Sequence, residues 1–334
     1  MTLRIGIIAC GMASEAIHLP AYSKVKGIKV VAACDPDIPR AERLAKQYEI
    51  PKLYKTYEEL LDNEQLDAVS VNSPHKFHAE HTIAALKKGC HVLVEKPMAL
   101  SGKEIRSMMT AARKAKKLLM VEQAVRFFPA CHKARQILAS GRLGEILTIR
   151  GRFGHAGPEN WSPTGQWFMQ KKESQGGCML DIGVHEIDLI RYVSGKEVKE
   201  VSAYFGTLKK KIDVEDNAVC LLRFDDGTVG TFESSWTCVP GVAHTEFYCE
   251  KGHLFLDLRA ENPLVIEKPK GGARPVTVPK KHPDVNAMAY FVKCIQKGLT
   301  PHCVADHAAR STEVVLGAAI STKQGGRAVK LPLK

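Results

Sequence analysis

Short apolar runs alternate with helix-forming stretches over the first third of the chain. The apolar runs, which have the length of buried strands, cover residues 3–9, 28–34, 68–72, 91–94 and 118–121. The helical stretches between them cover residues 41–48, 79–88 and 102–116. Strands that alternate with helices make right-handed crossovers and pair in parallel. The alternation therefore predicts a doubly wound parallel sheet of the α/β class.

The pattern changes at about residue 123. Strand-like runs now follow one another at residues 143–153, 198–207, 218–224, 229–236 and 245–249. The residues Asp225-Asp226-Gly227 between two of these runs are a hairpin signal. A chain of 334 residues also exceeds what one hydrophobic core usually supports. We therefore expect two domains, residues 1–122 and 123–334, the second an α+β domain with a mostly antiparallel sheet.

The composition argues against a membrane protein and against a disulfide framework. No apolar run approaches the roughly 20 residues of a membrane-spanning helix, so we expect no membrane segment. The ten cysteines include no Cys-x-x-Cys pair, and most lie in apolar surroundings such as Ala33-Cys34. Such cysteines suit buried thiols in a reducing compartment, which predicts a cytoplasmic protein.

A formal net charge of +12 raises the question of nucleic-acid binding. The basic clusters near residues 113–117, 209–211 and 280–281 are dispersed and lack interleaved aromatic residues. We therefore expect no nucleic-acid partner. A basic surface also steers anionic small molecules, such as a dinucleotide, toward a protein.

The turn after the first strand has the features of a phosphate-binding turn. The dinucleotide fingerprint G-x-G-x-x-G falls on Ala9, Gly11 and Ser14, so that only the middle glycine is present. Small residues there let backbone N–H groups and the following helix N-terminus approach a pyrophosphate. Asp35 ends the second strand, where a carboxylate accepts hydrogen bonds from the adenosine ribose.

The same carboxylate bears on the choice of cofactor. A carboxylate at Asp35 would repel a ribose 2′-phosphate, which favours NAD over NADP. Two alternatives stay open at this point. Arg40 is near enough in sequence to pair with such a phosphate, and Asp35 also suits a plain turn before Pro36.

A lysine stands at the end of a buried strand in Val-Leu-Val-Glu-Lys-Pro, residues 92–97. Ligands of open parallel sheets bind beyond the carboxyl ends of the strands, so Lys96 faces a ligand if this strand belongs to the sheet. Lys96 is therefore a catalytic candidate. The alternative is a strand that ends in solvated charges before a turn.

A second candidate centre lies between residues 176 and 190. Apolar residues at helical spacing predict a helix packed on the sheet, with Asp181 and His185 on one face at i and i+4. A carboxylate beside an imidazole fixes its tautomer and suits it for acid–base chemistry. A surface Asp/His pair of no consequence is the alternative. A metal site is not expected, because one histidine with two aspartates lacks the usual zinc ligands.

Taken together, these motifs resemble the glucose–fructose oxidoreductase/inositol dehydrogenase (Gfo/Idh/MocA) family. The motifs are Ala9-Cys10-Gly11, Asp35, Ser73-Pro74-His75 with His78, Glu95-Lys96-Pro97, and Gly176-Gly177-x-x-x-Asp181-x-x-x-His185-x-x-Asp188. The resemblance implies an N-terminal Rossmann domain, a C-terminal α+β domain with an open, mainly antiparallel sheet, and a nicotinamide cofactor. It also implies a homo-oligomer, a dimer or a tetramer, with a Lys-Pro bond that is often cis.

The resemblance further implies roles for individual residues. Lys96 would bind the reacting oxygen, His185 would exchange its proton, and Asp181 would lie beside it. The implied cofactor-binding residues are Ala9, Gly11, Met12, Ala13, Asp35, Ser73, Pro74, His75, His78, Glu95, Lys96 and Gln123. The implied substrate-binding residues are Lys96, Arg126, Asp181 and His185. Trp161 and Trp167 suit either ligand contact or core packing.

The expected function is reversible hydride transfer between the nicotinamide and a secondary alcohol or ketone of a sugar, cyclitol or related polyol. Two alternatives remain. One is an enzyme that holds NAD tightly and catalyses a reaction without net redox, such as glycoside cleavage or epimerisation. The other is a non-catalytic regulator that senses a dinucleotide, although such a protein needs no proton-transfer residues.

Overall fold

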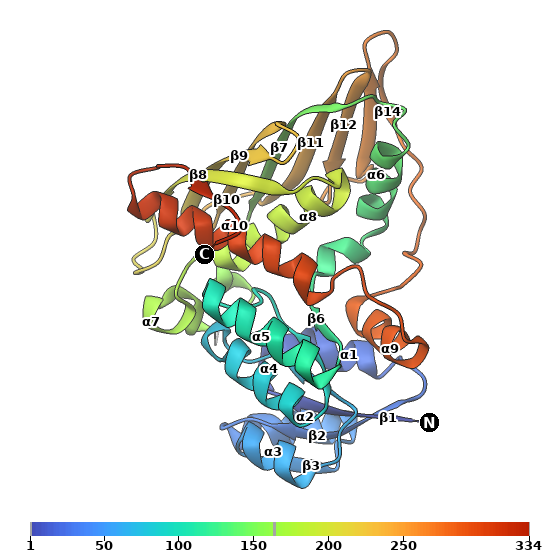
Figure 1. Ribbon diagram of the computed structural model, residues 1–334, viewed down its shortest axis with the longest axis vertical. Helices are drawn as coiled ribbons and strands as arrows, with labels where there is room; N and C mark the ends of the chain where they lie inside the picture. The colour runs from blue at the N-terminus through green and yellow to red at the C-terminus, as the bar shows by residue number, and fades with distance from the viewer. Residues whose placement is uncertain (1, 163–164, 334) are drawn as a thin grey trace. The chain divides into compact units, whose positions relative to one another are not determined.

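Six parallel strands form the sheet of the N-terminal part of the chain (Figure 1). In spatial order they are β3 (Lys52–Tyr54), β2 (Ile28–Cys34), β1 (Leu3–Ile8), β4 (Ala68–Val71), β5 (His91–Val94) and β6 (Leu119–Val121). The predicted parallel sheet is confirmed, and β3 is an additional strand. The strand order reverses between β1 and β4, and sheets of this kind bind ligands beyond the carboxyl ends of the strands at that point.

The structure, a computed structural model, describes residues 2–162 and 165–333. The chain forms two units, the first reaching Gln123 and including Asp284–Ala309, and the second comprising Ala124–Pro283 and the chain from Arg310 onward. The sequence-based boundary after residue 122 assigned residues 284–309 to the second domain. They join the first unit because α9 (Ala287–Lys297) packs against α1 and β5.

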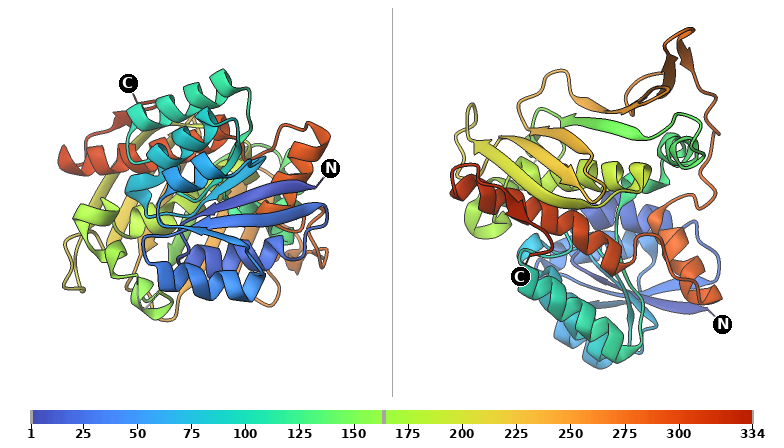
Figure 2. Two further views of the ribbon diagram at one scale, coloured as in Figure 1. Left: turned by 90° about the horizontal axis from the view of Figure 1, so that it is seen from below. Right: turned by 45° about the horizontal axis from the view of Figure 1, so that its top comes forward.

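Helices cover both faces of the first sheet (Figure 2). They are η1 (Ser14–His18), α1 (Leu19–Tyr22), α2 (Ile38–Tyr48), α3 (Tyr57–Asn63), η2 (His75–Phe77), α4 (His78–Lys87) and α5 (Gly102–Ala115). Their starts follow ordinary capping chemistry. Ser101 accepts a hydrogen bond from the Glu104 N–H at the start of α5, and Thr56 forms a capping box with Glu59 at α3.

The second unit contains a nine-stranded sheet. In spatial order its strands are β14 (Gly272–Pro275), β13 (Leu264–Lys268), β12 (Gly252–Asp257), β11 (Val242–Cys249), β7 (Ile146–Gly154), β10 (Val229–Ser235), β9 (Asn217–Phe224), β8 (Val198–Gly206) and β15 (Val329–Lys330). Neighbours pair antiparallel except β7 and β10. The mainly antiparallel sheet is confirmed, as is the hairpin at Asp225–Gly227 that joins β9 to β10.

In the part of this unit that the structure describes, helices lie against one face of the second sheet (Figure 2). The helical segments of the unit are η3 (Ala124–Phe127), α6 (Pro129–Ala139), η4 (Pro158–Asn160), η5 (Gln166–Met169), α7 (Lys171–Ser174), η6 (Met179–Gly183), α8 (Val184–Ser194) and most of α10 (Ala305–Lys323). Contacts link α8 to β7 and to α6. On the opposite face Val219, Leu221 and Val229 are exposed. The order of the described strands runs from β14 to β15 without closing, so the predicted open sheet is confirmed.

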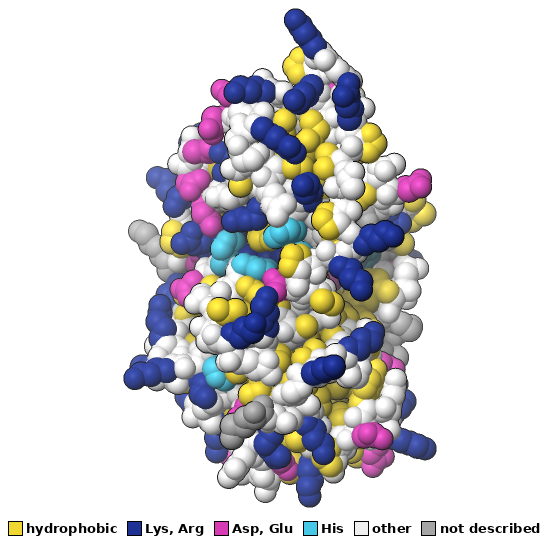
Figure 3. All heavy atoms as spheres, turned by 90° about the vertical axis from the view of Figure 1, so that its right-hand side faces the viewer, with side chains coloured by type: hydrophobic (Ala, Val, Ile, Leu, Met, Phe, Trp, Pro, Cys, Tyr) yellow, Lys and Arg dark blue, Asp and Glu magenta, His cyan; other side chains and the backbone are white. Residues whose placement is uncertain are grey.

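The remaining surface and the cysteines add two observations. On the face drawn in Figure 3, lysine and arginine side chains are spread among other residues and do not gather into one patch. The ten cysteines are thiols, and all but Cys238 are buried. Within the described residues, each helix is too short or too polar to cross a membrane.

Candidate active site

The turn after β1 keeps its tight shape without the first and third fingerprint glycines. Ala9 has φ +72°, a conformation that usually selects glycine. The Ser14 hydroxyl donates to the Ala9 carbonyl at 2.6 Å, and the Asn72 amide donates to the Ser14 hydroxyl at 2.7 Å. These bonds hold the turn closed. The two substitutions therefore leave the geometry of a dinucleotide turn intact.

The middle glycine leaves room for a ligand. A Cβ atom added at Gly11 would meet no atom within 4 Å, and Met12 and Ala13 after it begin the helical run that continues through η1 and α1. Backbone N–H groups at the start of a helix carry partial positive charge. The turn thus fits the pyrophosphate of a nicotinamide dinucleotide, with Gly11, Met12 and Ala13 supplying the N–H groups.

Asp35 is buried at the end of β2 and braces the same turn. Its Oδ2 accepts the Cys10 N–H at 2.7 Å, and its Oδ1 accepts the Asp37 N–H at 2.8 Å. A carboxylate has about four acceptor sites, so two backbone bonds leave capacity for ribose hydroxyls. Arg40 lies 3.8 Å from Asp35 Oδ2 and 2.9 Å from Asp37 Oδ2. The bond from the Asp37 N–H is typical of a turn residue, and Arg40 lies close to the carboxylate. The structure therefore contains the feature on which each of the two alternatives depends.

The loop after β4 is fixed by a buried histidine. His78 places one ring nitrogen 2.7 Å from the Ser73 carbonyl and the other 2.8 Å from the Pro97 carbonyl. Burial lowers the pKa of His78, and the two carbonyls oppose that effect. His78 therefore joins the loops that follow β4 and β5. Its neighbours Pro74, half-buried, and His75, buried, lie in the same loop.

Two buried amides near these loops have polar atoms with no hydrogen-bond partner in the described part of the chain. They are Asn72 Oδ1, just after β4, and both amide atoms of Gln123, shortly after β6. Buried polar atoms are nearly always paired. Their presence at the carboxyl ends of the strands suits a polar ligand such as a nicotinamide cofactor.

Lys96 is the second residue after β5 (His91–Val94), and its peptide bond to Pro97 is cis. The preceding residue, Glu95, is buried, and its Oε2 accepts the Lys96 backbone N–H at 3.2 Å. Its Oε1 lies 2.9 Å from His18 Nε2. Burial raises the pKa of Glu95, but the His18 hydrogen bond and the charges of His18 and Lys96 outweigh burial and hold it at about 2. An ionised carboxylate therefore accepts the backbone N–H of the candidate catalytic lysine.

In the second unit, Asp181 and His185 lie across a π-helical turn. The Val184 N–H bonds to the Met179 carbonyl, five residues back, and the α-helix proper begins at Val184. The single α-helix expected over this segment is therefore wrong in detail, because a π turn shifts the angular spacing of its side chains. Asp181 is buried and His185 is half-buried. The centre of the His185 ring lies 6.4 Å from the centre of the Phe153 ring.

Asp181 has two partners from elsewhere in its unit. The Trp236 indole N–H donates to Asp181 Oδ2 at 2.9 Å, and His155 Nε2 lies 3.7 Å from the same oxygen. Because His155 Nδ1 accepts the Gly157 N–H at 2.9 Å, the ring proton is on Nε2, facing Asp181. The Asp181 carboxylate thus has the Trp236 indole and the His155 imidazole next to one of its oxygens.

Comparison with known proteins identifies the family. Residues 3–123 match the oxidoreductase family with an NAD-binding Rossmann fold, and residues 131–255 match the GFO/IDH/MocA C-terminal domain. D-glucoside 3-dehydrogenase of Escherichia coli is 32% identical over 250 residues, 70% of each chain. The chain belongs to the Gfo/Idh/MocA oxidoreductase family.

Two further relatives agree with this assignment. Myo-inositol 2-dehydrogenase of Thermotoga maritima is 29% identical over 277 residues, 80% of this chain and 79% of that one. The WlbA dehydrogenase of Bordetella pertussis, solved with NADH and UDP-GlcNAcA, has a TM-score of 0.87 at 22% identity over the full length of both chains. The predicted family, fold class and NAD(P)-dependent oxidoreductase activity on CH–OH groups are confirmed.

Arg126 of this Gfo/Idh/MocA protein lies in an ion pair inside the second unit. Its Nε and Nη2 donate to the two carboxylate oxygens of Asp188, each at 2.5 Å, and both side chains are fully buried. Asp188 also accepts from the Ser311 hydroxyl at 2.8 Å. A guanidinium engaged in this way favours a structural role over the substrate contact expected from sequence.

Sequence reasoning missed His155 and Trp236. His155 follows β7 and Trp236 follows β10, and only the parallel pairing of these strands brings both toward Asp181. Trp161 packs edge-on to His155, and Trp167 stacks on Phe168 at 3.8 Å between ring centres. One sequence signal was available for His155, since polar side chains just after strands often line sites.

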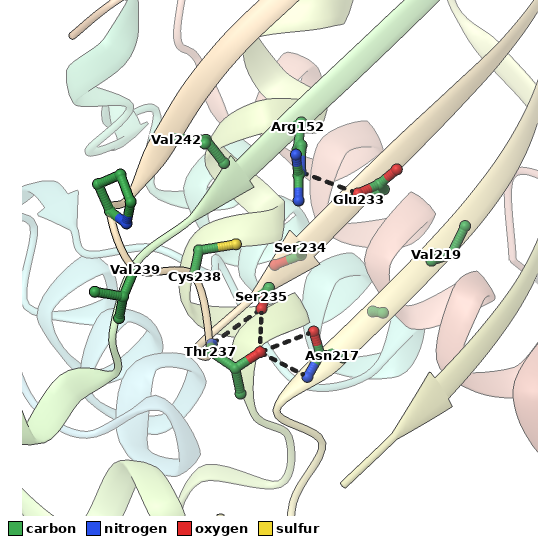
Figure 4. Close-up of a pocket in the computed structure, with 12 residues that line it drawn as sticks. Arg152, Asn217, Val219, Glu233, Ser234, Ser235, Thr237, Cys238, Val239 and Val242 are labelled. Atoms are coloured by element: carbon green, nitrogen blue, oxygen red, sulfur yellow. Dashed lines mark hydrogen bonds and ion pairs between the residues drawn. The ribbon is translucent and has the colours of Figure 1, made fainter. Parts of the chain in front are cut away.

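A hollow of about 490 Å³ lies on the open face of the second sheet, lined by residues of β7, β9, β10 and the segment before β11 (Figure 4). Arg152 and Glu233 form an ion pair at 3.1 Å there, and Ser235, Thr237 and Asn217 bond to one another. These polar groups satisfy each other. None of the residues predicted for catalysis lines this hollow, so it is not the candidate active site.

Proposed function

We propose that this protein is an NAD-dependent dehydrogenase that reversibly oxidises a secondary hydroxyl on a six-membered ring polyol, such as a sugar or a cyclitol. The two curated relatives described above act, by their names, on a glucoside and on myo-inositol. Both are ring polyols. The observation that carries the proposal is Lys96 at the carboxyl end of β5, with its backbone fixed by an ionised carboxylate.

In the proposed mechanism the cofactor supplies the hydride acceptor, the nicotinamide C4. Lys96 donates a hydrogen bond to the reacting oxygen and stabilises the negative charge that develops there. His185 accepts the hydroxyl proton as general base, and returns it in the reverse direction. Asp181 orients His185 and favours its protonated form. The same two side chains, Lys96 and His185, would bind the substrate hydroxyl before reaction.

Several first-unit residues are proposed to serve the cofactor in two ways. Gly11, Met12, Ala13, Asp35 and Gln123 would contact it through backbone N–H groups, a carboxylate and an amide. The other predicted cofactor residues would shape its site from loops and turns; they are Ala9, Ser73, Pro74, His75, His78 and Glu95. Arg126 is not carried into the proposal as a substrate ligand, because its guanidinium is buried against Asp188.

The proposed cofactor is NAD rather than NADP. A buried carboxylate at Asp35 would lie beside a ribose 2′-phosphate and repel it. Arg40 would favour NADP, because its guanidinium lies 3.8 Å from Asp35, is partly exposed and could pair with a 2′-phosphate. The Asp37 carboxylate, 2.9 Å from Arg40, already partners that cation and weakens it as a phosphate ligand.

We also propose a homo-oligomer that uses the open face of the second sheet. Leu147, Tyr204, Val219, Leu221 and Val229 are exposed there although they are large and apolar. Exposed apolar area on a strand face marks an interaction surface. Sedimentation of Leu221→Lys against the wild type tests this, and an unchanged mass would contradict it. Ten thiol cysteines support the proposed cytoplasmic location.

The deciding experiment is a substrate screen. Sugars, inositols and sugar acids are offered with NAD and with NADP in separate reactions, and reduced cofactor is followed by its absorbance. We expect reduction of NAD with at least one ring polyol. Cofactor that co-purifies and never exchanges would favour an enzyme without net redox. No turnover together with capture of a protein partner would favour a regulator.

A further inference from the structure

A chain of buried hydrogen bonds ends beneath Lys96. The Tyr22 hydroxyl is 3.0 Å from the Ser70 hydroxyl, which is 2.9 Å from His18 Nδ1. His18 Nε2 is 2.9 Å from Glu95 Oε1. The four residues come from α1, β4, η1 and the end of β5. Neither His18 nor Tyr22 belongs to any motif that the sequence singled out.

The chain has one direction that satisfies every donor. Tyr22 donates to Ser70, Ser70 donates to His18 Nδ1, and His18 Nε2–H donates to Glu95. In the reverse direction the Tyr22 proton would have no acceptor, because this hydroxyl makes a single hydrogen bond among the described residues. His18 Nε2 therefore donates to Glu95, which carries the negative charge.

The position of His18 depends on a local departure from α-helical geometry. The Leu19 N–H bonds to the Ser14 carbonyl, five residues back, which makes residues 14–18 a π turn. The side chain of His18 is fully buried there. Turns of this kind are rare and are often retained at functional sites. Apolar side chains of similar volume would pack this interior without the cost of burying a charge.

The negative charge of Glu95 lies next to the backbone of Lys96. Glu95 Oε2 accepts the Lys96 N–H, so the network fixes the peptide that carries the lysine. The charged or titratable groups that act on Glu95 are His18 from η1, His78 from α4 and Lys96 itself. Of these, Lys96 is the cation nearest to substrate in the proposed function. The Glu95 carboxylate, held by His18 and bonded to the Lys96 N–H, fixes the backbone from which the lysine side chain extends.

We propose that His18 and Glu95 are positioning residues for Lys96, with Glu95 as the charged anchor and His18 as the donor that orients it. The inference rests on the proposed role of Lys96 in hydride transfer. The expected effect of the His18 variants is on the rate of the chemical step and not on cofactor binding, because His18, Ser70 and Tyr22 are not among the proposed cofactor residues. Misplacing a catalytic group by about 1 Å is enough to cost on the order of 100-fold in rate.

The test compares three variants by single-turnover hydride transfer, NAD affinity and thermal unfolding. His18→Leu removes the donor to Glu95, and we expect a fall of roughly 10- to 100-fold in rate with NAD affinity unchanged. His18→Gln keeps an N–H near the Nε2 position and should recover most of the rate. Tyr22→Phe, at the far end of the chain, is the matched control and should leave the rate near wild type.

A double variant separates this inference from the proposed function. In a Lys96→Met background, His18→Leu should cause no further loss, because both act through the same lysine. If Lys96→Met lowers the rate but His18→Leu matches Tyr22→Phe, the positioning role is wrong and the proposed function stands. If Lys96→Met itself has no effect, the proposed function is wrong. Should His18→Leu fail to fold, Glu95→Gln supplies the same comparison, with a wild-type rate overturning the inference.

Discussion

The indole N–H of Trp236 donates to Oδ2 of Asp181 at 2.9 Å, although 55 positions separate the two residues in the sequence. The indole has a donor and no acceptor, so the carboxylate oxygen is the acceptor of this bond. His155, with its proton on Nε2, lies 3.7 Å from the same oxygen. Asp181 Oδ2 thus accepts the indole hydrogen bond and faces the imidazole of His155.

Replacing Trp236 by Phe should lower kcat by roughly tenfold, because a hydrogen bond to a charged group contributes about 1.5–3 kcal/mol. The acidic limb of the pH–rate profile should move as well. Without the indole hydrogen bond, Asp181 is no longer fixed in place, and its effect on the proposed base His185 should change. Steady-state kinetics across pH on a verified polyol, with NAD affinity as the control, measure both. A lower kcat with an unmoved pH profile would reduce Trp236 to a packing residue.

Removal of the buried ion pair should destabilise the second unit strongly. Arg126→Met leaves the Asp188 carboxylate buried without its main partner, and such losses cost about 3–5 kcal/mol. Arg152→Met is the matched control, because Arg152 forms an exposed pair with Glu233 on the open face. Urea unfolding of both variants measures the difference. Equal stabilities, with a raised KM for Arg126→Met, would restore Arg126 as a substrate ligand.

The sequence predicted the parallel sheet well because its strands are buried on both faces and read as uninterrupted apolar runs. β2 and β5 were predicted with their observed bounds. The three-residue strand β3 was not predicted, because it is too short for a periodic signal. The assignment of α9 to the first unit was not predicted either, because it depends on tertiary packing against α1 and β5. Neither π turn was predicted, because the shift that one extra residue causes extends over a single turn, which is too short to be recognised in the sequence.

For the candidate site, the sequence nominated residues that belong to linear motifs and did not nominate residues that are defined by packing. Lys96, Asp181 and His185 stand in recognisable spacings. His18, His155 and Trp236 are each an isolated polar or aromatic residue in the sequence. Their partners lie between 26 and 77 positions away, so only the fold reveals them.

Glu186 should make stability depend on pH. It is buried beside Gly151, and Thr245 Oγ1 donates to it at 2.6 Å. Burial raises the pKa of Glu186 from 4.5 to about 7, against the opposing effect of that hydrogen bond. Between these values the unfolded chain loses a proton that the folded protein keeps. The free energy of unfolding should therefore fall by about 3 kcal/mol as pH rises from 4.5 to 7.

Glu186→Gln removes this titration and should be more stable than wild type at pH 8 but not at pH 4.5. Chemical denaturation of both proteins at the two pH values gives the comparison. Glu233→Gln, an exposed carboxyl on the open face, is the control and should show no such change. A gap between Glu186→Gln and wild type that is the same at both pH values would mean that folding does not raise the pKa of Glu186.

Asp35 should set the choice between NAD and NADP. Asp35→Asn keeps acceptor capacity for the Cys10 N–H but removes the charge, so repulsion of a 2′-phosphate should fall and NADP should improve by on the order of tenfold. Arg40→Ala is the companion variant. If NADP binding were lost in Arg40→Ala while Asp35→Asn changed nothing, Arg40 and not Asp35 would govern the preference.

The central claim is that Lys96 stabilises charge on the reacting oxygen during hydride transfer. The most direct measurement is the single-turnover rate of NAD reduction by a ring polyol, in wild type and in Lys96→Met, with NAD affinity measured in parallel. The account predicts that Lys96→Met slows hydride transfer about 100- to 1,000-fold while NAD affinity is unchanged. A wild-type rate in Lys96→Met would contradict it.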